Sequence, residues 1–286
     1  MAAEDLIEAL QSDGATRILN CLPSPDTEQD WRFRNAVNAG LITAPAPLPA
    51  SRDLRATWWT IADQGSTGSC VGWALADSVL RWHLVEDGLL PQSVTMSPRF
   101  LWMAAKETDE FATEPSTFIE RAGTSLKAAL EVARRYGAVR DSVLPFGSGA
   151  LFEGDVNTFY ATAAQLKIVA YFNLGTNLSE WRHWLAVNGP VLVRLSVDQT
   201  WDQASQSNGN LDTYRTETAR GGHAVALAGY TPDRLIVRNS WGTSWGDGGY
   251  AYASPGYAAA AFTEAYGVTT SPRNGQRHEG PPRWHR

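Results

Sequence analysis

The sequence changes near its middle from helical to strand-forming patterns, and this change restricts the fold more than any other feature. The first half predicts three helices, at 70–86, 98–106 and 125–136. The second half predicts one helix at 179–188 among four strands, at 166–174, 191–197, 223–230 and 234–241. Because a doubly wound sheet would alternate helices and strands along the chain, this order indicates an α+β protein built in two parts.

The length and composition are those of an ordinary globular protein. The chain has 286 residues, of which 43% are hydrophobic and 19% charged, and this is enough for one large domain or for two lobes about a cleft. The run TAPAPLPA at 43–50 predicts a Pro-rich linker, so the residues ahead of it are expected to form an extension of the main fold.

The charge distribution argues against nucleic acid as a partner. The formal net charge is −6, whereas binding to phosphates requires clusters of Lys and Arg. Basic residues gather only at 271–286, among Gly and Pro, and we expect this segment to be a disordered, solvated tail.

The first residues carry Glu and Asp in place of the basic region of a secretory signal, and no stretch approaches 18 apolar residues. We therefore expect no membrane partner and a cytoplasmic location, although export that reads no cleaved signal would leave no mark in the sequence. The two cysteines, Cys21 and Cys70, exclude a disulfide scaffold and fit a reducing compartment.

Cys70 stands where the glycine-rich segment 63–69 runs into the predicted helix 70–86. Unpaired N–H groups and the positive end of the helix dipole stabilise an anion, so a Cys in the first turn is expected to have a pKa lowered toward the reactive thiolate. An isolated Cys would more simply fill space in a core, but the glycines before Cys70 favour a nucleophile. Cys21 has neither feature and is assigned no role.

A second concentration of functional residue types lies at 220–252. His223 opens one predicted strand and Asn239 closes the next, and adjacent antiparallel strands would bring the two side chains together. An amide oxygen that accepts the imidazole N–H holds the ring in one tautomer and orientation. Either residue alone is also compatible with a structural role, but together with Cys70 they favour a Cys-His-Asn site.

The residues around these positions form two longer patterns. Gln64 to Cys70 read QGSTGSC, Asn239 to Tyr250 read NSWGTSWGDGGY, and the His segment 222–225 reads GHAV. These segments resemble Q-G-x-C-G-S-C, N-S-W-G-x-x-W-G-x-x-G-Y and the catalytic-His strand of papain and the cathepsins. The separations of His223 and Asn239 from Cys70 are close to the roughly 130–150 residues typical of that family. The chain is therefore identified from its sequence as a divergent, cytoplasmic-type member of the papain-like cysteine peptidases.

The resemblance implies an α+β papain-like fold of two lobes that flank an active-site cleft. The helical lobe would lie mainly at 64–160 and a β-barrel-like lobe mainly at 161–270. The peptidase domain would then be 48–270, behind an N-terminal extension and Pro-rich linker at 1–47.

The resemblance also implies roles for five residues. Cys70 is the nucleophile, and His223 is its general base and acid. Asn239 orients the His223 ring, Gln64 binds the oxyanion together with the Cys70 backbone N–H, and Trp241 covers the contact between Asn239 and His223. This chemistry requires no metal and no organic cofactor.

Two departures from the family pattern affect these expectations. Thr67 stands where secreted relatives have a Cys that pairs within the helical lobe, which agrees with a reducing location. We expect the long inhibitory prosegment of those relatives to be absent, because only the short extension at 1–47 precedes the matching region. We expect this extension to be a packed N-terminal arm, with coverage of the cleft as the alternative.

Other kinds of site find no support in the sequence. The cysteines and the five histidines show no paired ligand spacing for zinc, and neither a phosphate-binding loop nor a dinucleotide fingerprint is present.

The leading functional hypothesis is a thiol-dependent endopeptidase that hydrolyses a protein or peptide substrate through a Cys70 thioester and is open to control by a protein inhibitor. One alternative is an acyltransferase or transamidase, because the same thioester can pass its acyl group to an amine. The other is a non-catalytic binding module that retains the cleft.

Overall fold

The computed structural model describes residues 8–10, 16–42, 47–110, 123–150, 152 and 154–270. The tail expected at 271–286 and part of the Pro-rich linker, 43–46, lie outside the described residues.

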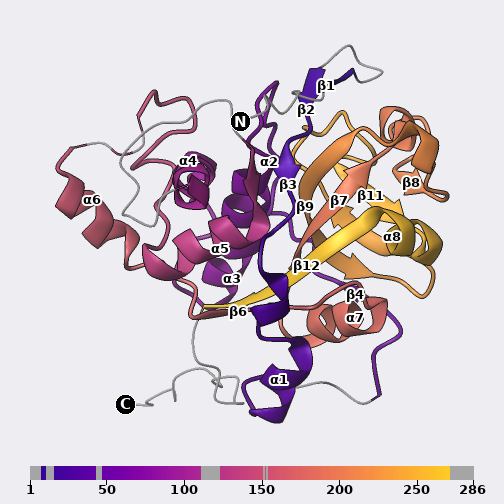
Figure 1. Ribbon diagram of the computed structural model, residues 1–286, viewed down its shortest axis with the longest axis horizontal. Helices are drawn as coiled ribbons and strands as arrows, with labels where there is room; N and C mark the ends of the chain where they lie inside the picture. The colour runs from indigo at the N-terminus through magenta and orange to yellow at the C-terminus, as the bar shows by residue number, and fades with distance from the viewer. Residues whose placement is uncertain are drawn as a thin grey trace, which may run out of the picture.

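Helices form one lobe of the molecule, on the left in Figure 1. A continuous helical run consists of α2 (Cys70–Gly72), the π-helical stretch η2 (Trp73–Leu80) and α3 (Arg81–Glu86). Around this run lie α4 (Pro98–Glu110), α5 (Leu126–Arg135) and α6 (Val156–Ala163). The helices predicted at 70–86, 98–106 and 125–136 are confirmed, and every residue at 74–84 is buried, as a helix that is apolar on nearly all sides requires.

An eight-stranded sheet forms the second lobe. Its order is β6-β12-β7-β9-β10-β11-β8, with β4 also paired to β9, and all neighbours are antiparallel except β11 and β8. The strands are β4 (Arg52–Asp53), β6 (Ala170–Asn173), β7 (Val191–Val197), β8 (Asn210–Leu211), β9 (Gly221–Tyr230), β10 (Leu235–Arg238), β11 (Tyr250–Ala253) and β12 (Phe262–Thr269). Helices α7 (Leu178–Val187) and α8 (Pro255–Ala261) and the short η3 (Gln199–Gln203) and η4 (Thr216–Thr218) belong to the same lobe.

Alternate residues of β9 face two different cores, as the period of two in a strand dictates. Val225 and Leu227 lie in the core of the sheet lobe, whereas Ala224 and Ala226 lie in the core of the helical lobe. The small alanine side chains allow the helical run that begins at Cys70 to pack closely against β9. The sheet therefore lies against the start of the helix that carries the candidate nucleophile.

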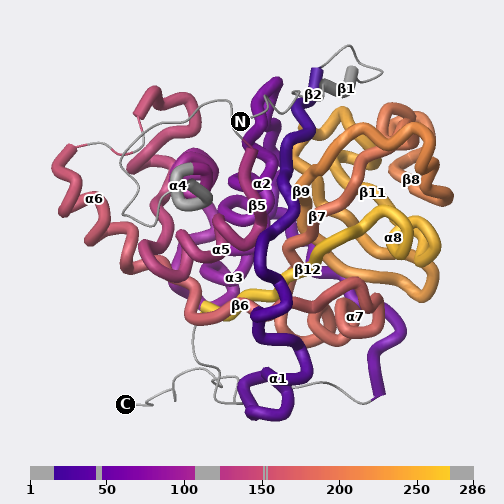
Figure 2. The backbone as a smooth tube through the Cα atoms, viewed as in Figure 1, coloured from indigo at the N-terminus to yellow at the C-terminus, as the bar shows by residue number. Residues whose placement is uncertain are grey.

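The N-terminal segment lies along the boundary between the two lobes, where Figure 2 shows it as an indigo tube. It contains β1 (Glu8–Leu10), β2 (Thr16–Ile18), β3 (Cys21–Leu22), η1 (Thr27–Gln29) and α1 (Phe33–Asn38). Strand β3 pairs in parallel with β5 (Thr124–Ser125) of the helical lobe, and Asn20 forms a bridge with Gly222 of the sheet lobe. The segment thus contacts both lobes.

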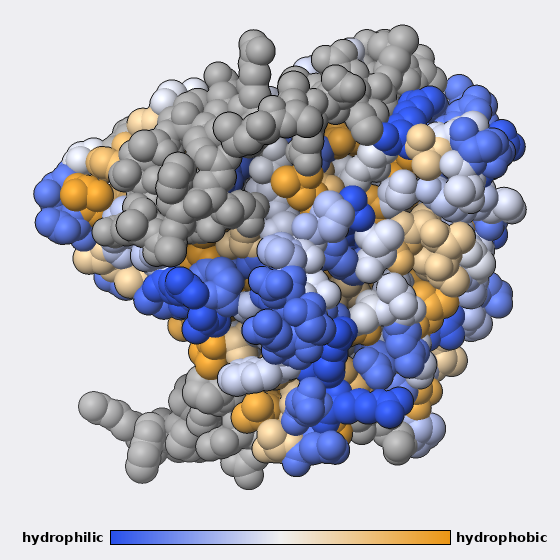
Figure 3. Space-filling model, in the orientation of Figure 1, coloured by the Kyte–Doolittle hydropathy of each residue, from blue (hydrophilic) through white to orange (hydrophobic). Residues whose placement is uncertain are grey.

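On the face shown in Figure 3, the hydrophobic surface of the described residues is divided into small spots within a mainly hydrophilic surface. The exposed large apolar side chains are Trp31, Leu41, Leu89 and Val169. None of the described helices combines the length and apolar character needed to cross a membrane.

A buried ion pair joins the lobes beneath the candidate site. Arg238, at the end of β10, donates to the Asp77 carboxylate in η2 at 2.8 Å, and both side chains are less than 5% exposed. Arg238 also donates to the Thr60 carbonyl at 2.6 Å and lies over the Trp59 ring. Because Arg238 directly precedes Asn239, this pair ties the end of β10 to the helix that begins at Cys70.

We predict that Arg238→Met lowers the free energy of unfolding by about 1.5–3 kcal/mol, because the buried Asp77 carboxylate loses its partner from the other lobe and keeps only its ion pair with Arg81. The matched control is Arg234→Met, which removes a pair with the partly exposed Asp212 and should cost less than about 1 kcal/mol. Urea denaturation measures both values, and equal shifts of the midpoint would contradict the role given to Arg238.

Candidate active site

The loop ahead of Cys70 is held by its own hydrogen bonds. The Thr67 hydroxyl donates to the Gln64 carbonyl at 2.6 Å and lies 2.6 Å from the Ser69 hydroxyl. These contacts lead the chain into the helix at Cys70, which is fully buried. Thr67 therefore stabilises the loop by hydrogen bonds, without a disulfide at this position.

His223 and Asn239 are brought together by the antiparallel pair β9–β10, as predicted. His223 lies near the start of β9, and Asn239 follows the last residue of β10. The ring Nε2 of His223 lies 2.8 Å from the Asn239 Oδ1, and both side chains are almost completely buried. Oδ1 is an acceptor only, so Nε2 carries the proton and Nδ1 is left to face Cys70.

The surroundings of Cys70 favour its thiolate. The pKa of Cys70 is lowered well below the ordinary value by a hydrogen bond from the Cys21 thiol, against the opposing effect of burial. Contact with the His223 ring and a backbone hydrogen bond from Ala224 lower the pKa further. A helix start, an imidazole and a second thiol thus surround the Cys70 sulfur and favour its anionic form.

Gln64 reaches the site through a pairing of the loop before Cys70 with the residues after β10. The Gln64 N–H donates to the Ser240 carbonyl at 2.8 Å, and Asp63 forms an antiparallel bridge with Trp241. The residues after Arg238 pair with this loop and do not continue the β9–β10 ladder, so β10 ends before the predicted position 241. The Gln64 side chain accepts from the Ser240 hydroxyl and donates one of its two amide hydrogens to the Thr67 carbonyl, both at 2.8 Å.

Aromatic rings surround His223. The Trp241 ring is fully buried with its centroid 4.8 Å from that of His223, and Trp201 meets the His223 ring edge-on at 5.5 Å. Trp245 stacks on Trp201 and donates its indole N–H to the Trp201 carbonyl. Trp201 was not singled out from the sequence, because it lies outside both motifs and one Trp among twelve carries no signal.

The fold and the site were compared with known proteins. A model of the papain family of cysteine proteases matches residues 48–270, most of the chain. The chain belongs to this family. It is therefore a cysteine peptidase, a hydrolase with a papain-like α+β fold.

Individual relatives of this papain-family chain agree with the assignment. It is 27% identical over 234 residues to cathepsin B-like CP3 of Giardia intestinalis, covering 77% of this chain and 73% of the relative. The crystal structure of xylellain, a cysteine protease from Xylella fastidiosa, superposes with a TM-score of 0.72 at 21% identity, over 88% of this chain and 96% of xylellain. A Carica candamarcensis cysteine protease in complex with E-64 superposes with a TM-score of 0.55 at 19% identity, over 78% and 99% of the two chains.

Cys21 also lies at this site, although no role was assigned to it from the sequence. Its carbonyl accepts from Arg194 Nε at 2.9 Å, and its side chain is buried against Cys70. A Cβ on Gly222 would lie only 2.0 Å from the Cys21 carbonyl oxygen, so a glycine is required there. No motif surrounds Cys21, and only the topology brings it to Cys70.

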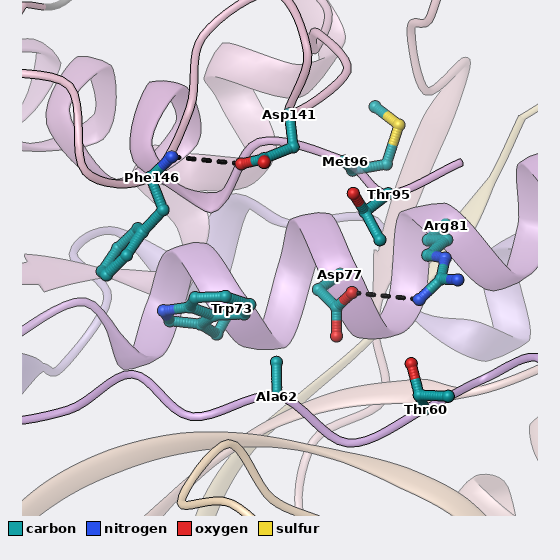
Figure 4. A pocket seen from close by; sticks show the side chains of 9 residues that line it. All are labelled: Thr60, Ala62, Trp73, Asp77, Arg81, Thr95, Met96, Asp141 and Phe146. Carbon is teal, nitrogen blue, oxygen red and sulfur yellow. Dashed lines mark hydrogen bonds and ion pairs between the residues drawn. The ribbon is translucent and has the colours of Figure 1, made fainter. Parts of the chain in front are cut away.

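A cavity of about 170 Å³ lies on another side of the helical run. Figure 4 shows Asp77 and Arg81 on the helix at one side of it and Asp141 facing them from a loop. The lining residues are Thr60, Ala62, Trp73, Asp77, Arg81, Thr95, Met96, Asp141 and Phe146. Cys70 and His223 are not among them, so this cavity is separate from the candidate active site.

Among the described residues, no three His, Cys, Asp or Glu side chains are grouped so that they could hold a metal ion.

We predict that the alkylation rate of Cys70 falls less steeply between pH 8 and pH 6 than that of an ordinary thiol, because its pKa is lowered. An ordinary thiol, with a pKa near 8.5, would lose about tenfold of its thiolate for each pH unit below that value. Peptide mass spectrometry after timed exposure to iodoacetamide gives the rate. Cys21 is the internal control, because burial raises its pKa and its labelling should remain slow over the same range.

Proposed function

We propose that this papain-family protease is an endopeptidase that cleaves peptide bonds through a thioester on Cys70. The contact of Cys70 with a His223 ring that Asn239 holds at 2.8 Å carries this proposal. A nucleophile, a base and a residue that orients the base are thereby aligned in one buried site.

The proposed reaction has two halves. The Cys70 thiolate attacks the scissile carbonyl carbon, and the His223 imidazolium gives its proton to the leaving amine as the C–N bond breaks. Water then attacks the thioester while His223 takes its proton, and the acid product leaves with Cys70 restored. Asn239 keeps the ring in the tautomer that presents Nδ1 to sulfur in both halves.

Gln64 is suited to stabilise the oxyanion of each tetrahedral intermediate. Its carbonyl oxygen and one amide hydrogen are already bonded within the loop, which fixes the amide plane and leaves its second amide hydrogen for the substrate. The backbone N–H of Cys70, in the first turn of the helix, would be the second donor. Trp241 and Trp201 exclude water from the His223–Asn239 bond, which strengthens it.

The N-terminal segment lies against the loop before Cys70, and the Cys70 side chain is fully buried. Arg17 donates to Asp63 at 2.5 Å and to the Trp241 carbonyl at 3.1 Å, Asn20 lies against Gly68, and β3 pairs with the edge of β5. Asp30, further along the segment, bonds Lys127 of the helical lobe and Asn173 of the sheet lobe. We infer that substrates, and any protein inhibitor, reach Cys70 only after this segment moves.

The cytoplasmic location stays a prediction. Its support is that both cysteines are free thiols and that none of the contacts of the site depends on a disulfide.

The peptidase proposal predicts that Cys70→Ala abolishes cleavage of a proteome-derived peptide mixture. Gln64→Ala should lower kcat by about 10²–10³-fold through loss of an oxyanion donor. The matched control is Gln203→Ala, an exposed position outside the site, with no expected change. Mass spectrometry of the products measures all three, and identical product profiles for wild type and Cys70→Ala would overturn the proposal.

The same preparation separates the alternatives. Incorporation of a labelled amine into the acyl product would favour a transamidase, whereas hydrolysis without incorporation supports the endopeptidase. An epoxysuccinyl thiol probe that leaves Cys70 unmodified would favour a non-catalytic binding module.

We further predict that Arg17→Ala raises kcat/KM for a short peptide by at least about tenfold. Each hydrogen bond to a charged group contributes about 1.5–3 kcal/mol, so its loss increases the fraction of molecules with an open site. The matched control is Arg34→Ala in α1, whose side chain is 82% exposed and whose pair with Glu180 is 3.5 Å long. Unchanged kcat/KM in both variants would show that the segment does not limit access.

A further inference from the structure

The two cysteines of the chain face each other although they lie on separate elements. Cys70 begins α2 and Cys21 begins β3, and both side chains are buried in one cluster. Asn20 lies against Gly68 and the Cys21 carbonyl lies against Gly222, so the N-terminal segment carries Cys21 past the start of the helix at Cys70. Each thiol also shifts the pKa of the other, which agrees with this proximity. The chain contains no other cysteine, so each has the other as its single intramolecular partner for disulfide formation.

The position of Cys21 is set on both sides of its backbone. The pairing of Cys21 with Thr124 fixes it to the helical lobe, and the hydrogen bond from Arg194 Nε fixes it to the sheet lobe. Cys70 is fixed by the helix that it begins. Both cysteines are therefore held in one buried cluster by elements of the two lobes.

We propose that Cys21 is a resolving thiol, and that a peroxide converts the Cys21–Cys70 pair into a disulfide that masks the nucleophile. The formation of this bond rests on the geometry, whereas its effect on activity rests on the proposed function. The oxidant class is hydrogen peroxide or an organic hydroperoxide.

The chemistry balances in two steps. The Cys70 thiolate attacks one oxygen of hydrogen peroxide, the O–O bond breaks, and Cys70 sulfenic acid and hydroxide form. The Cys21 sulfur then attacks the Cys70 sulfur, the S–O bond breaks, and the hydroxyl leaves as water with the Cys21 proton. Two thiols and one peroxide thus give one disulfide and two waters, and a dithiol reductant reverses the oxidation.

The site has the features that this role requires. The attacking sulfur must be a thiolate, and Cys70 is the thiol whose surroundings favour that form. The resolving thiol must be close enough to condense with the sulfenic acid before a second peroxide arrives, and Cys21 is buried with Cys70 in one cluster. The bond would also hold the N-terminal segment over the site, because Cys21 belongs to that segment.

The experiment treats the full-length protein with a small excess of hydrogen peroxide, then digests it without reduction. The expected product is a cross-linked peptide pair containing Cys21 and Cys70, two hydrogen atoms lighter than the reduced pair. This readout does not depend on peptidase activity, so it tests the bond even if the proposed function fails. Absence of the cross-link, with Cys70 present as sulfinic or sulfonic acid, would overturn the proposal.

The variant Cys21→Ser tests the protective role, and Cys21→Ala is the second variant should a hydroxyl disturb the buried site. Dithiothreitol should restore the activity of oxidised wild type to its starting value. In the variants, on the order of tenfold less activity should return, because sulfinic and sulfonic acids resist thiol reductants. Equal recovery in wild type and both variants would contradict a resolving role.

Discussion

The site depends on the close packing of the helix at 70–86 against strand β9. Ala224 and Ala226 present small side chains to this helix, so its first turn can lie beside His223 on the same strand. A larger residue at either position would hold the helix away from the sheet and separate sulfur from imidazole. The proposed catalytic geometry therefore depends on β9, whose alternate residues belong to the cores of both lobes.

The same packing buries polar groups, and two of them bond to partners across the boundary. Arg238 reaches Asp77, and Gln64 reaches Ser240, so that residues on both sides of Cys70 and of Asn239 are linked between lobes. An apolar interface would allow the lobes to slide, whereas hydrogen bonds of fixed length and direction do not. These links hold the elements that carry the reacting groups in register, as a site of this kind needs.

The sequence allowed four helical segments, the strands β6, β7, β9 and β10 and the triad positions to be predicted, because each is encoded locally. The helix at 70–86 follows from apolar periodicity, and the proximity of His223 to Asn239 follows from two adjacent strands. The parallel pairing of Cys21 with Thr124 and the contact of Trp201 with His223 could not be predicted. They join residues far apart in the chain, and neither position carries a periodicity or turn signal that points to its partner.

The position of Cys21 couples the N-terminal segment to the charge on Cys70. The Cys21 thiol lowers the pKa of Cys70, so by linkage the thiolate must bind the segment more tightly than the neutral thiol does. Asp63 acts in the same direction: burial raises its pKa, but the hydrogen bonds from Arg17 and Gly65 outweigh burial and lower it. For both groups the pKa is lower when the segment covers the site (closed) than when it has moved away (open). Their stabilisation of the closed state is therefore complete above the open-state pKa and is lost as the pH falls through the closed-state pKa. The nucleophile and the segment that covers it therefore stabilise each other most in the ionisation state that the reaction uses, and release of the segment must overcome this coupling.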